Sequence, residues 1–392
     1  MTKRILVLGA GLAQVDCIRS AQAGGYTVIA LDGNPEAEGK SVADTFIHLD
    51  IMDVEAVLKC AREHEVHGVV SYAAEAPLQS VLAVRTALGL PGLGEEPLSI
   101  SQDKLRQRRC FDGLAQPAYR PLRSREDCQS VSELGFPLII KPVDSSGSRG
   151  VSQVDVLTSV EPAWQAAMEA SKMGSAIAES FMEGVEYTVE GISIDGEHHI
   201  LAISEKAKPP GKYRVATELW YPAQLDADME TRIHRLLRDA YTRAGVDSTP
   251  THSEVIITTD GPKIVEIGCR GGGFYVFSKV VRLVTGYDIA LNWTRISAGD
   301  PVEPPGQIQR NPVLLYFFSA PPGILQSVSQ VDRLKSNPRI EFGFFFQQGE
   351  RVPELATDGS RAGWAIATAD SVEALREMYN EILLKVEFRT ES

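Results

Sequence analysis

The sequence predicts an α/β region with a parallel sheet, followed by regions of α+β character. In the first 95 residues, apolar runs at 5–8, 27–31 and 68–72 alternate with helical patterns at 15–23 and 54–63. Uninterrupted apolar strands that alternate with helices are typical of a parallel sheet covered on both faces. We therefore expect such a sheet at the N-terminus.

The pattern changes after a Pro- and Gly-rich segment at 90–97. Two strand–turn–strand units follow, around Asp195-Gly196 and around Asp260-Gly261, and turns of this composition join antiparallel strands. The middle of the chain is therefore expected to be α+β rather than doubly wound.

A second Pro-rich segment, 301–305, separates the hairpins from a stretch of short strands with one helix at 372–384. A chain of 392 residues is longer than one domain usually is. We therefore expect three domains, at 1–95, 96–305 and 306–392.

Composition excludes several classes of function. The formal net charge of −13 argues against nonspecific nucleic-acid binding, which needs a basic face. No apolar run approaches the roughly 18–20 residues that a membrane span needs. The five cysteines form no CxxC pair, so neither a zinc site nor a disulfide framework is indicated. The N-terminus lacks a signal-peptide cleavage site, and we expect a cytoplasmic location.

A glycine turn, GAGLAQ at 9–14, follows the first strand, and Asp32 ends the second. This arrangement is similar to the dinucleotide fingerprint GxGxxG, in which an acid binds the ribose. Gln14 replaces the third glycine, however, so a tight strand-to-helix turn without a dinucleotide is the alternative.

A strongly apolar strand ends at Lys141 and is followed by the small, polar loop 144–150, DSSGSRG. A lysine at a strand end can reach an anion, and successive backbone N–H groups of such a loop can hold a phosphate. The alternative is a mobile surface loop with an exposed lysine. Further along, alternation places Glu186, Thr188 and Glu190 on one face of a strand.

The hairpin around Asp260 gives the strongest physical argument for a metal site. A three-residue loop with Gly261 in the left-handed position pairs Thr258 with Pro262, and that register sets Glu254 opposite Glu266. Two carboxylates about 4.5–5.5 Å apart repel unless a cation lies between them. Mg²⁺, which favours one or two carboxylates plus substrate phosphates, fits this requirement. The alternatives are acids splayed into water, or a two-residue turn that shifts the register by one.

These features, in this order, resemble the ATP-grasp superfamily, and specifically its carboxylate–amine ligases such as the L-amino-acid ligases, biotin carboxylase and glycinamide-ribotide synthetase. The matching segments are SQDK at 101–104, GFPLIIKP at 135–142 with its Gly/Ser loop, AESFMEGVEYTVEG at 178–191 and HSEVIITTDGPKIVEIGCRGGG at 252–273. The resemblance implies a Rossmann-like pre-ATP-grasp domain, an ATP-grasp core of two α+β lobes, and a small C-terminal α+β lobe.

The resemblance also implies a role for individual residues. Lys104 and Lys141 would contact the ATP phosphates, Glu179 and the Phe181 backbone the adenine, and Glu186 the ribose. The residues that would close over the β and γ phosphates are Ser145, Ser146, Gly147, Ser148 and Gly150. Glu254 and Glu266 would bind Mg²⁺ or Mn²⁺. Arg270 would act with Lys141 in catalysis and would steady the acyl phosphate or the substrate carboxylate. The expected substrate contacts are Glu75, Lys206, Arg214, His252 and Gly272. At Gly268 the family often has a metal-binding Asn, so this chain lacks that ligand of the second metal.

The implied activity is an ATP-dependent ligation in which a carboxylate is activated as an acyl phosphate and joined to an amine. An amino acid or another small metabolite is the first choice of substrate, and a purine-pathway or carboxylase-type enzyme is the second. An NAD(P)-dependent oxidoreductase built on Asp32 and a nucleotide-binding protein without catalysis are the alternatives from other classes. Homodimers are common in the family.

Overall fold

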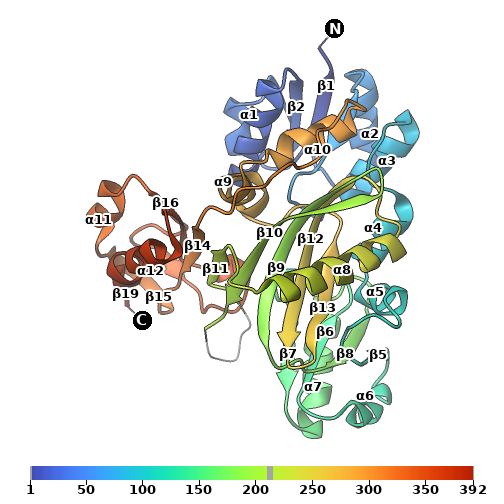
Figure 1. The fold of residues 1–392 in the computed structure, drawn as a ribbon, viewed down its shortest axis with the longest axis vertical. Coiled ribbons are helices and arrows are strands. Elements are labelled where there is room, and N and C mark those ends of the chain that lie inside the picture. Colours follow the sequence, from blue (N-terminus) through green and yellow to red (C-terminus); the bar gives the residue numbers. More distant parts are fainter. Residues whose placement is uncertain (1, 210–214, 392) are drawn as a thin grey trace.

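The computed structural model describes residues 2–209 and 215–391. Figure 1 shows an N-terminal α/β layer, a large central sheet, a small sheet beside it and a C-terminal lobe at one side. Within the described residues, no helix is both long and apolar enough to cross a membrane. The expected combination of a parallel sheet with antiparallel sheets is confirmed.

The N-terminal sheet is parallel, with strand order β3-β2-β1-β4. Its strands are β1 (Arg4–Leu8), β2 (Thr27–Asp32), β3 (Thr45–His48) and β4 (Gly68–Val70). Alternate residues of β1 and β2 pack on helices on opposite faces. One face is covered by α1 (Val15–Ala23) and α10 (Ile289–Ser297), and the other by α2 (Val54–Glu63) and α3 (Leu78–Leu88). The sheet is therefore buried on both sides, as the apolar strands predict.

The small sheet is antiparallel, with order β5-β8-β6-β7. Its strands are β5 (Tyr119–Leu122), β6 (Leu138–Pro142), β7 (Ser152–Val154) and β8 (Ala176–Ser180). The helices α6 (Asp127–Ser130) and α7 (Val160–Ala170) cover it. Two helices, α4 (Glu95–Ser101) and α5 (Lys104–Cys110), precede the sheet, and the Asp103 carboxylate caps α5 by accepting from the N–H of Leu105 and Arg106.

The large sheet has eight strands in the order β13-β12-β9-β10-β11-β14-β18-β16. In chain order they are β9 (Val185–Ile194), β10 (Glu197–Ala207), β11 (Glu218–Tyr221), β12 (Thr249–Thr258), β13 (Gly261–Gly268), β14 (Val313–Phe318), β16 (Ile340–Phe344) and β18 (Gly363–Thr368). Helix α8 (Ala227–Arg243) packs on it. The two predicted hairpins, β9–β10 and β12–β13, are confirmed.

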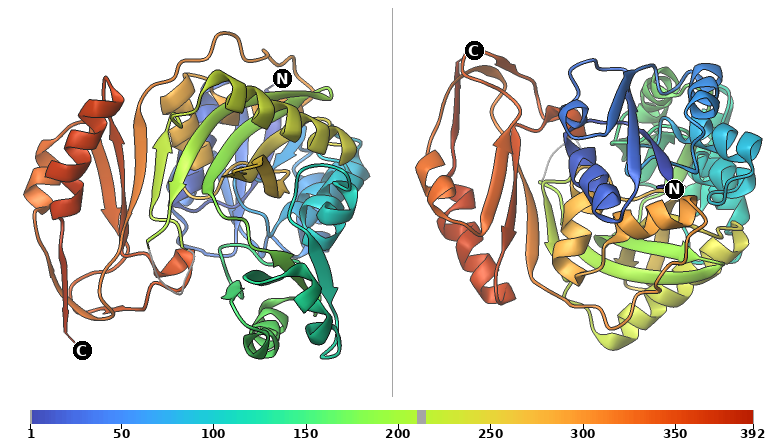
Figure 2. Two further views of the ribbon diagram at one scale, coloured as in Figure 1. Left: turned by 60° about the horizontal axis from the view of Figure 1, so that its bottom comes forward. Right: turned by 90° about the horizontal axis from the view of Figure 1, so that it is seen from above.

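The C-terminal lobe shares the large sheet, because β11 pairs with β14. It adds the sheet β17-β15-β19, formed by β15 (Gly323–Val328), β17 (Arg351–Val352) and β19 (Phe388–Glu391). Two helices, α11 (Val331–Ser336) and α12 (Val372–Glu381), lie in this lobe beside the end of the large sheet (Figure 2). The expectation of one helix here was incomplete, since α11 is a short second one. The expected domain boundaries stay a prediction.

Candidate active site

A cavity of about 180 Å³ lies between the small sheet and the large sheet. Most of the residues expected at ATP or metal line it: Lys104, Lys141, Ser145, Ser146, Gly147, Ser148, Glu179, Phe181, Glu186, Glu254 and Glu266. Lys206, expected at the substrate, also lines it, whereas Gly150 is not among the lining residues. We refer to it as the nucleotide cavity. Segments far apart in the sequence thus converge on one space.

One wall of the nucleotide cavity holds a buried triad of charges. The Arg108 Nε atom lies 2.8 Å from Glu179 Oε1, and Lys141 Nζ lies 2.8 Å from Glu179 Oε2. All three side chains are buried. Burial acts to raise the pKa of Glu179, but Arg108 and Lys141 outweigh it and hold that pKa below its usual value. Burial, with Arg108 and Lys104, lowers the pKa of Lys141 against the pull of Glu179.

This triad bears on the adenine contact expected of Glu179. Both carboxylate oxygens already have a cationic partner, and the Phe181 N–H donates to the Pro137 carbonyl at 3.1 Å. The carboxylate therefore positions the Lys141 ammonium in this structure. A direct contact between Glu179 or Phe181 and adenine stays a prediction.

A second charged group lies on the facing strands. Lys206 Nζ lies 2.7 Å from Glu186 Oε1 and 2.5 Å from Glu254 Oε1, and Lys208 pairs with the other Glu186 oxygen. Burial acts to raise the pKa of Glu186, but the two lysines lower it to about 2. Burial acts to lower the pKa of Lys206, but Glu186 and Glu254 raise it. Lys206 is therefore a fixed cation between two carboxylates.

The β12–β13 hairpin places Glu254 opposite Glu266, as expected, by a route that the sequence did not indicate. The turn has two residues and pairs Thr258 with Gly261, so the expected pairing with Pro262 was wrong. A register shift between Glu254 and Val255 then restores the pairing of the two glutamates. The bulge therefore corrects the one-residue offset of the turn.

Both glutamates have a lysine partner. Lys104 Nζ lies 3.1 Å from Glu266 Oε2 and donates to the Ser145 carbonyl at 2.8 Å. Burial acts to raise the pKa of Glu266, but Lys104 and Lys141 hold it well below its usual value. The two acids are thus tolerated side by side because Lys104 and Lys206 neutralise them, so repulsion alone does not require a metal.

The donor set nevertheless fits Mg²⁺ in one specific way. Over residues 2–209 and 215–391, no group of three or more His, Cys, Asp or Glu side chains is placed to hold a metal ion. Mg²⁺ usually takes one or two carboxylates and completes its six ligands with phosphate and water. Glu254 and Glu266 line the same cavity as residues of the 145–150 loop, which is expected to bind the ATP phosphates. The two carboxylates therefore suit a metal ion that is also bound by a phosphate.

The loop between β6 and β7 is shaped by residues with positive φ, at Gly147, Ser148 and Gly150. A Cβ atom on Gly150 would lie 2.7 Å from the Ala170 Cβ, so glycine is required there for packing on α7. On its other side, Gly147 lies close to Asp358 of the C-terminal lobe. The loop therefore lies where the C-terminal lobe meets the nucleotide cavity.

A second, larger cavity of about 640 Å³ adjoins the first and shares five lining residues with it, Lys206, Ala216, Glu254, Asp358 and Arg361. Four phenylalanines are among its other lining residues: Phe274, Phe317, Phe345 and Phe346. We refer to it as the aromatic cavity. It offers an apolar space whose polar end is the charged group around Glu254.

Arg361 occupies the junction of the two cavities and was missed by sequence reasoning. Its guanidinium lies 3.7 Å from the centre of the Phe317 ring, Nη2 lies 2.9 Å from Asp358, and Nε and Nη2 donate to the Ala216 carbonyl. Burial lowers the pKa of Arg361 from its usual value, with Asp358 opposing this. Stacking and ion pairing hold this cation at the junction.

The remaining expected substrate residues form two groups. His252, which lines the aromatic cavity, lies with Nδ1 2.5 Å from Oε1 of the fully buried Glu190, and the Gly272 N–H donates to Oε2 at 3.0 Å. Arg270 lies 3.5 Å from Glu75 and donates to the Gly271 carbonyl; it is not among the lining residues of either cavity, but its charge helps to lower the pKa of Glu266, which lines the nucleotide cavity. Arg214 lies outside the described residues.

The comparisons with known proteins agree with this arrangement. Residues 134–277 match the family model of the ATP-grasp domain, and residues 316–391 match that of the L-amino acid ligase C-terminal domain 2. The chain therefore contains an ATP-grasp domain.

One relative and two solved structures are informative for this ATP-grasp domain protein. The formate-dependent phosphoribosylglycinamide formyltransferase of Rhodococcus jostii (strain RHA1) is 31% identical over 205 residues, which are 50% of this chain and 51% of that protein. The chain thus spans about half the length of this relative. The crystal structure of the L-amino acid ligase from Bacillus licheniformis has a TM-score of 0.87 at 21% identity, with 100% of this chain and 99% of that chain covered. The biotin carboxylase domain of the Hydrogenobacter thermophilus 2-oxoglutarate carboxylase, crystallised with MgADP, has a TM-score of 0.79 at 17% identity, with 99% and 91% covered. The two structures show the shared fold.

The N-terminal glycine turn has a structural role in this ATP-grasp protein. The Asp32 carboxylate accepts from the N–H groups of Ala10 at 2.7 Å and Asn34 at 2.8 Å. The Gly39 N–H donates to the Ala10 carbonyl at 2.7 Å, and a Cβ on Gly39 would lie 2.7 Å from that oxygen. The acid and the turn are thus already engaged within the protein, which favours the tight-turn interpretation over a dinucleotide site.

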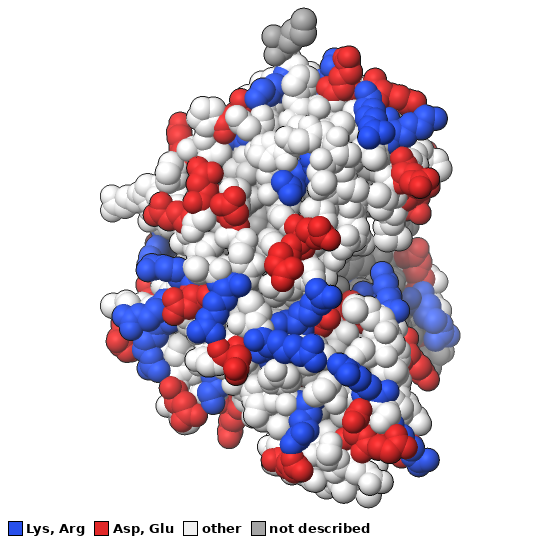
Figure 3. Space-filling model, turned by 90° about the vertical axis from the view of Figure 1, so that its right-hand side faces the viewer, with Lys and Arg blue, Asp and Glu red and all other residues white. Residues whose placement is uncertain are grey.

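One face of the protein carries charged side chains of both signs. In Figure 3, Lys and Arg side chains gather across the middle of the face shown, interspersed with Asp and Glu. Acidic side chains therefore lie among the basic ones on this face.

Proposed function

We propose that this protein is an ATP-dependent carboxylate–amine ligase that forms an acyl phosphate. The observation that carries the proposal is the junction of the two cavities at Lys206, Glu254 and Arg361. A terminal phosphate held at this junction would face a carboxylate whose apolar part occupies the aromatic cavity. The geometry thus suits transfer from a nucleotide to a second, smaller molecule.

The proposed chemistry has two steps. An oxygen of the substrate carboxylate attacks the γ phosphorus, the bond to the bridging oxygen breaks, and ADP leaves with that electron pair. The amine nitrogen then attacks the acyl carbon and loses a proton, and inorganic phosphate leaves. Phosphoryl transfer of this kind depends mainly on positioning and charge neutralisation.

The residues of the nucleotide cavity can meet those needs. Lys104 and Lys141 would contact the phosphates, and the Ser145–Gly150 loop would exclude water from the acyl phosphate. Glu254 and Glu266 would hold Mg²⁺, which neutralises phosphate charge when bound. Arg361 adds a cation that belongs to the C-terminal lobe, so the site is complete only with this lobe in place.

The lining of the aromatic cavity favours an amino acid with an apolar side chain as one substrate. Its four phenylalanines provide a large apolar surface, while its cations, Lys206 and Arg361, are confined to the junction. A ribotide such as the substrate of the Rhodococcus relative carries a phosphate of its own, which would need further donors. We therefore keep the purine-pathway activity as the second choice.

The test is a screen of carboxylates and amines that measures phosphate release and ADP, with hydroxylamine added to trap acyl phosphate as a hydroxamate. We expect turnover that needs Mg²⁺, a carboxylate and an acceptor together, and a loss of about 100-fold or more in Glu266→Gln, as for removal of a transition-state electrostatic contact. Glu133→Gln, at an exposed ion pair, is the matched control. Turnover independent of any acid or amine would refute the proposal.

Two further statements belong to this proposal. ATP as substrate is supplied in the cytoplasm, which keeps that location as our expectation. The biotin carboxylase neighbour is named as a domain dimer, and we carry the expected homodimer as a prediction that light scattering can test.

A further inference from the structure

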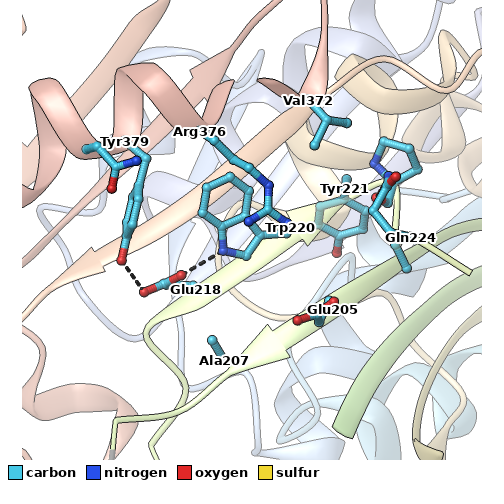
Figure 4. Close-up of a pocket in the computed structure, with 12 residues that line it drawn as sticks. Glu205, Ala207, Glu218, Trp220, Tyr221, Gln224, Val372, Arg376 and Tyr379 are labelled. Carbon is cyan, nitrogen blue, oxygen red and sulfur yellow. Dashed lines mark hydrogen bonds between the residues drawn. The ribbon is translucent and has the colours of Figure 1, made fainter. Parts of the chain in front are cut away.

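A third cavity, of about 280 Å³, lies on the other face of the large sheet from the nucleotide cavity. Strands β10 and β11 form its floor, and helix α12 of the C-terminal lobe forms one side (Figure 4). Glu205 and Ala207 line this cavity, whereas their neighbours Lys206 and Lys208 line the nucleotide cavity. Because side chains alternate along a strand, β10 separates the two spaces while belonging to both.

At one corner of the cavity, two aromatic side chains donate hydrogen bonds to one carboxylate. The Tyr379 hydroxyl donates to Glu218 Oε1 at 2.6 Å, and Trp220 Nε1 donates to Glu218 Oε2 at 2.7 Å. The two rings meet edge to face, with centroids 5.1 Å apart. Figure 4 shows both contacts converging on the carboxylate. Glu218 is thus fixed in place by neutral donors, and among the described residues no cation lies within ion-pair distance of it.

Two further charged groups of the lining lack a partner of opposite sign. The Glu205 side chain makes no hydrogen bond or ion pair with any residue that the structure describes, and the same part of the chain offers Arg376 no carboxylate within ion-pair distance. The Arg376 guanidinium lies over the Trp220 ring, 5.4 Å from its centroid. The cavity thus presents two carboxylates, one guanidinium and an aromatic surface.

We propose that this cavity binds a single free α-amino acid. The ligand ammonium would lie near Glu205 and Glu218, and its carboxylate would pair with Arg376, which is suited to planar anions. An apolar side chain would pack on Val372 and the Trp220 ring. The volume of about 280 Å³ lies just below the usual range of ligand cavities, which begins at about 300 Å³, and so suits one amino acid rather than a nucleotide.

The position of the cavity couples it to the active site. Its floor strand carries Lys206, and its side helix belongs to the lobe that supplies Arg361 to the junction. An amino acid held between β11 and α12 would therefore stabilise one placement of that lobe. Binding itself does not depend on the proposed ligation, so the two ideas can fail separately.

The test uses ¹⁹F NMR of the full chain labelled with 5-fluorotryptophan. The chain has four tryptophans. Trp220 reports on the new cavity, while Trp364, whose ring lies 5.7 Å from Phe274, reports on the aromatic cavity. Each signal is assigned by a Trp→Phe variant. The probes are L-phenylalanine and its two halves, phenethylamine, which lacks the carboxylate, and 3-phenylpropionate, which lacks the ammonium.

We expect L-phenylalanine to shift the Trp220 signal in a saturable way and both halves to do so at least about tenfold more weakly, because each lacks one charge-assisted contact. Glu205→Gln and Arg376→Gln should raise the Trp220 midpoint by a similar factor and leave the Trp364 response unchanged. Glu373→Gln, on an exposed position of α12, is the matched control. The proposal would be overturned if L-phenylalanine did not shift the Trp220 signal, or if either half shifted it as strongly as L-phenylalanine does. It would also be overturned if the Trp220 midpoint were unchanged in Glu205→Gln and Arg376→Gln.

Discussion

The buried triad of Arg108, Glu179 and Lys141 makes a quantitative prediction for Glu179→Gln. The change keeps the shape of the side chain and removes its charge, so two buried cations lose their common partner. Breaking one partner of a buried ion pair costs about 3–5 kcal/mol. Arg108 keeps its hydrogen bond to the Val265 carbonyl, and burial already lowers the pKa of Lys141. We therefore expect a loss near the lower bound, about 3 kcal/mol.

The assay is urea unfolding at several pH values, with Glu133→Gln as the exposed control, for which about 0–1 kcal/mol is expected. In the variant the native state disfavours charged Lys141, so its folded pKa lies below its unfolded value. The associated penalty is full at neutral pH and disappears as pH rises through the folded pKa toward the unfolded one, near 10.5. The loss caused by Glu179→Gln should therefore shrink at high pH. A loss no larger than that of the control, or one that grows with pH, would refute this reasoning.

Three further outcomes follow from the same structure. Gly272→Ala should destabilise the fold and weaken turnover, because the new Cβ would lie 2.7 Å from the Glu190 carboxylate; thermal unfolding and phosphate release measure both effects. Glu186 stabilises the fold at pH values above its unfolded pKa of about 4.5, and this contribution is lost as pH falls toward 2. Glu186→Gln should therefore flatten the curve of stability against pH between these two values. An unchanged slope would contradict the role of Lys206. Arg361→Lys should lower kcat/KM by about tenfold or more, since lysine cannot reproduce the planar contacts; kinetics indistinguishable from wild type would exclude Arg361 from the site.

The N-terminal sheet was the most predictable part of the fold. The expected helices at 15–23 and 54–63 coincide with α1 and α2, because their apolar positions and the flanking strands form one local pattern. The strand β3, at Thr45–His48, was not expected, since its residues are half-buried or exposed and give no apolar run. Neither was α10, which packs on this sheet from more than 200 residues away. Local patterns carry no information on such distant packing.

The candidate site likewise contains some residues that the sequence predicted and others that it did not. Residues within the motifs that carry the resemblance, such as Lys104 and Glu266, were expected at one site from the sequence, and the structure places them in one cavity. Arg108 and Arg361 were not, because each is an arginine in an unremarkable segment whose partner lies 71 or 145 positions away. The one signal that could have found Arg108 is its position in α5, one turn after Lys104, where a helix turns both side chains to the same face.

In the β12–β13 hairpin, the predicted turn was wrong but the predicted pairing of Glu254 with Glu266 was correct. In a strand the side-chain period is two, so a one-residue offset moves a side chain to the opposite face and separates Glu254 from Glu266. The two-residue turn introduces this offset at Thr258, and the shift beyond Val255 removes it before the glutamates are reached. The extra residue, Val265, lines the nucleotide cavity, and its carbonyl accepts a hydrogen bond from Arg108. The β-bulge at Val265 therefore links the strand that carries Glu266 to the buried triad. The geometry of the site depends on this bulge, which no alternation of apolar and polar residues could indicate.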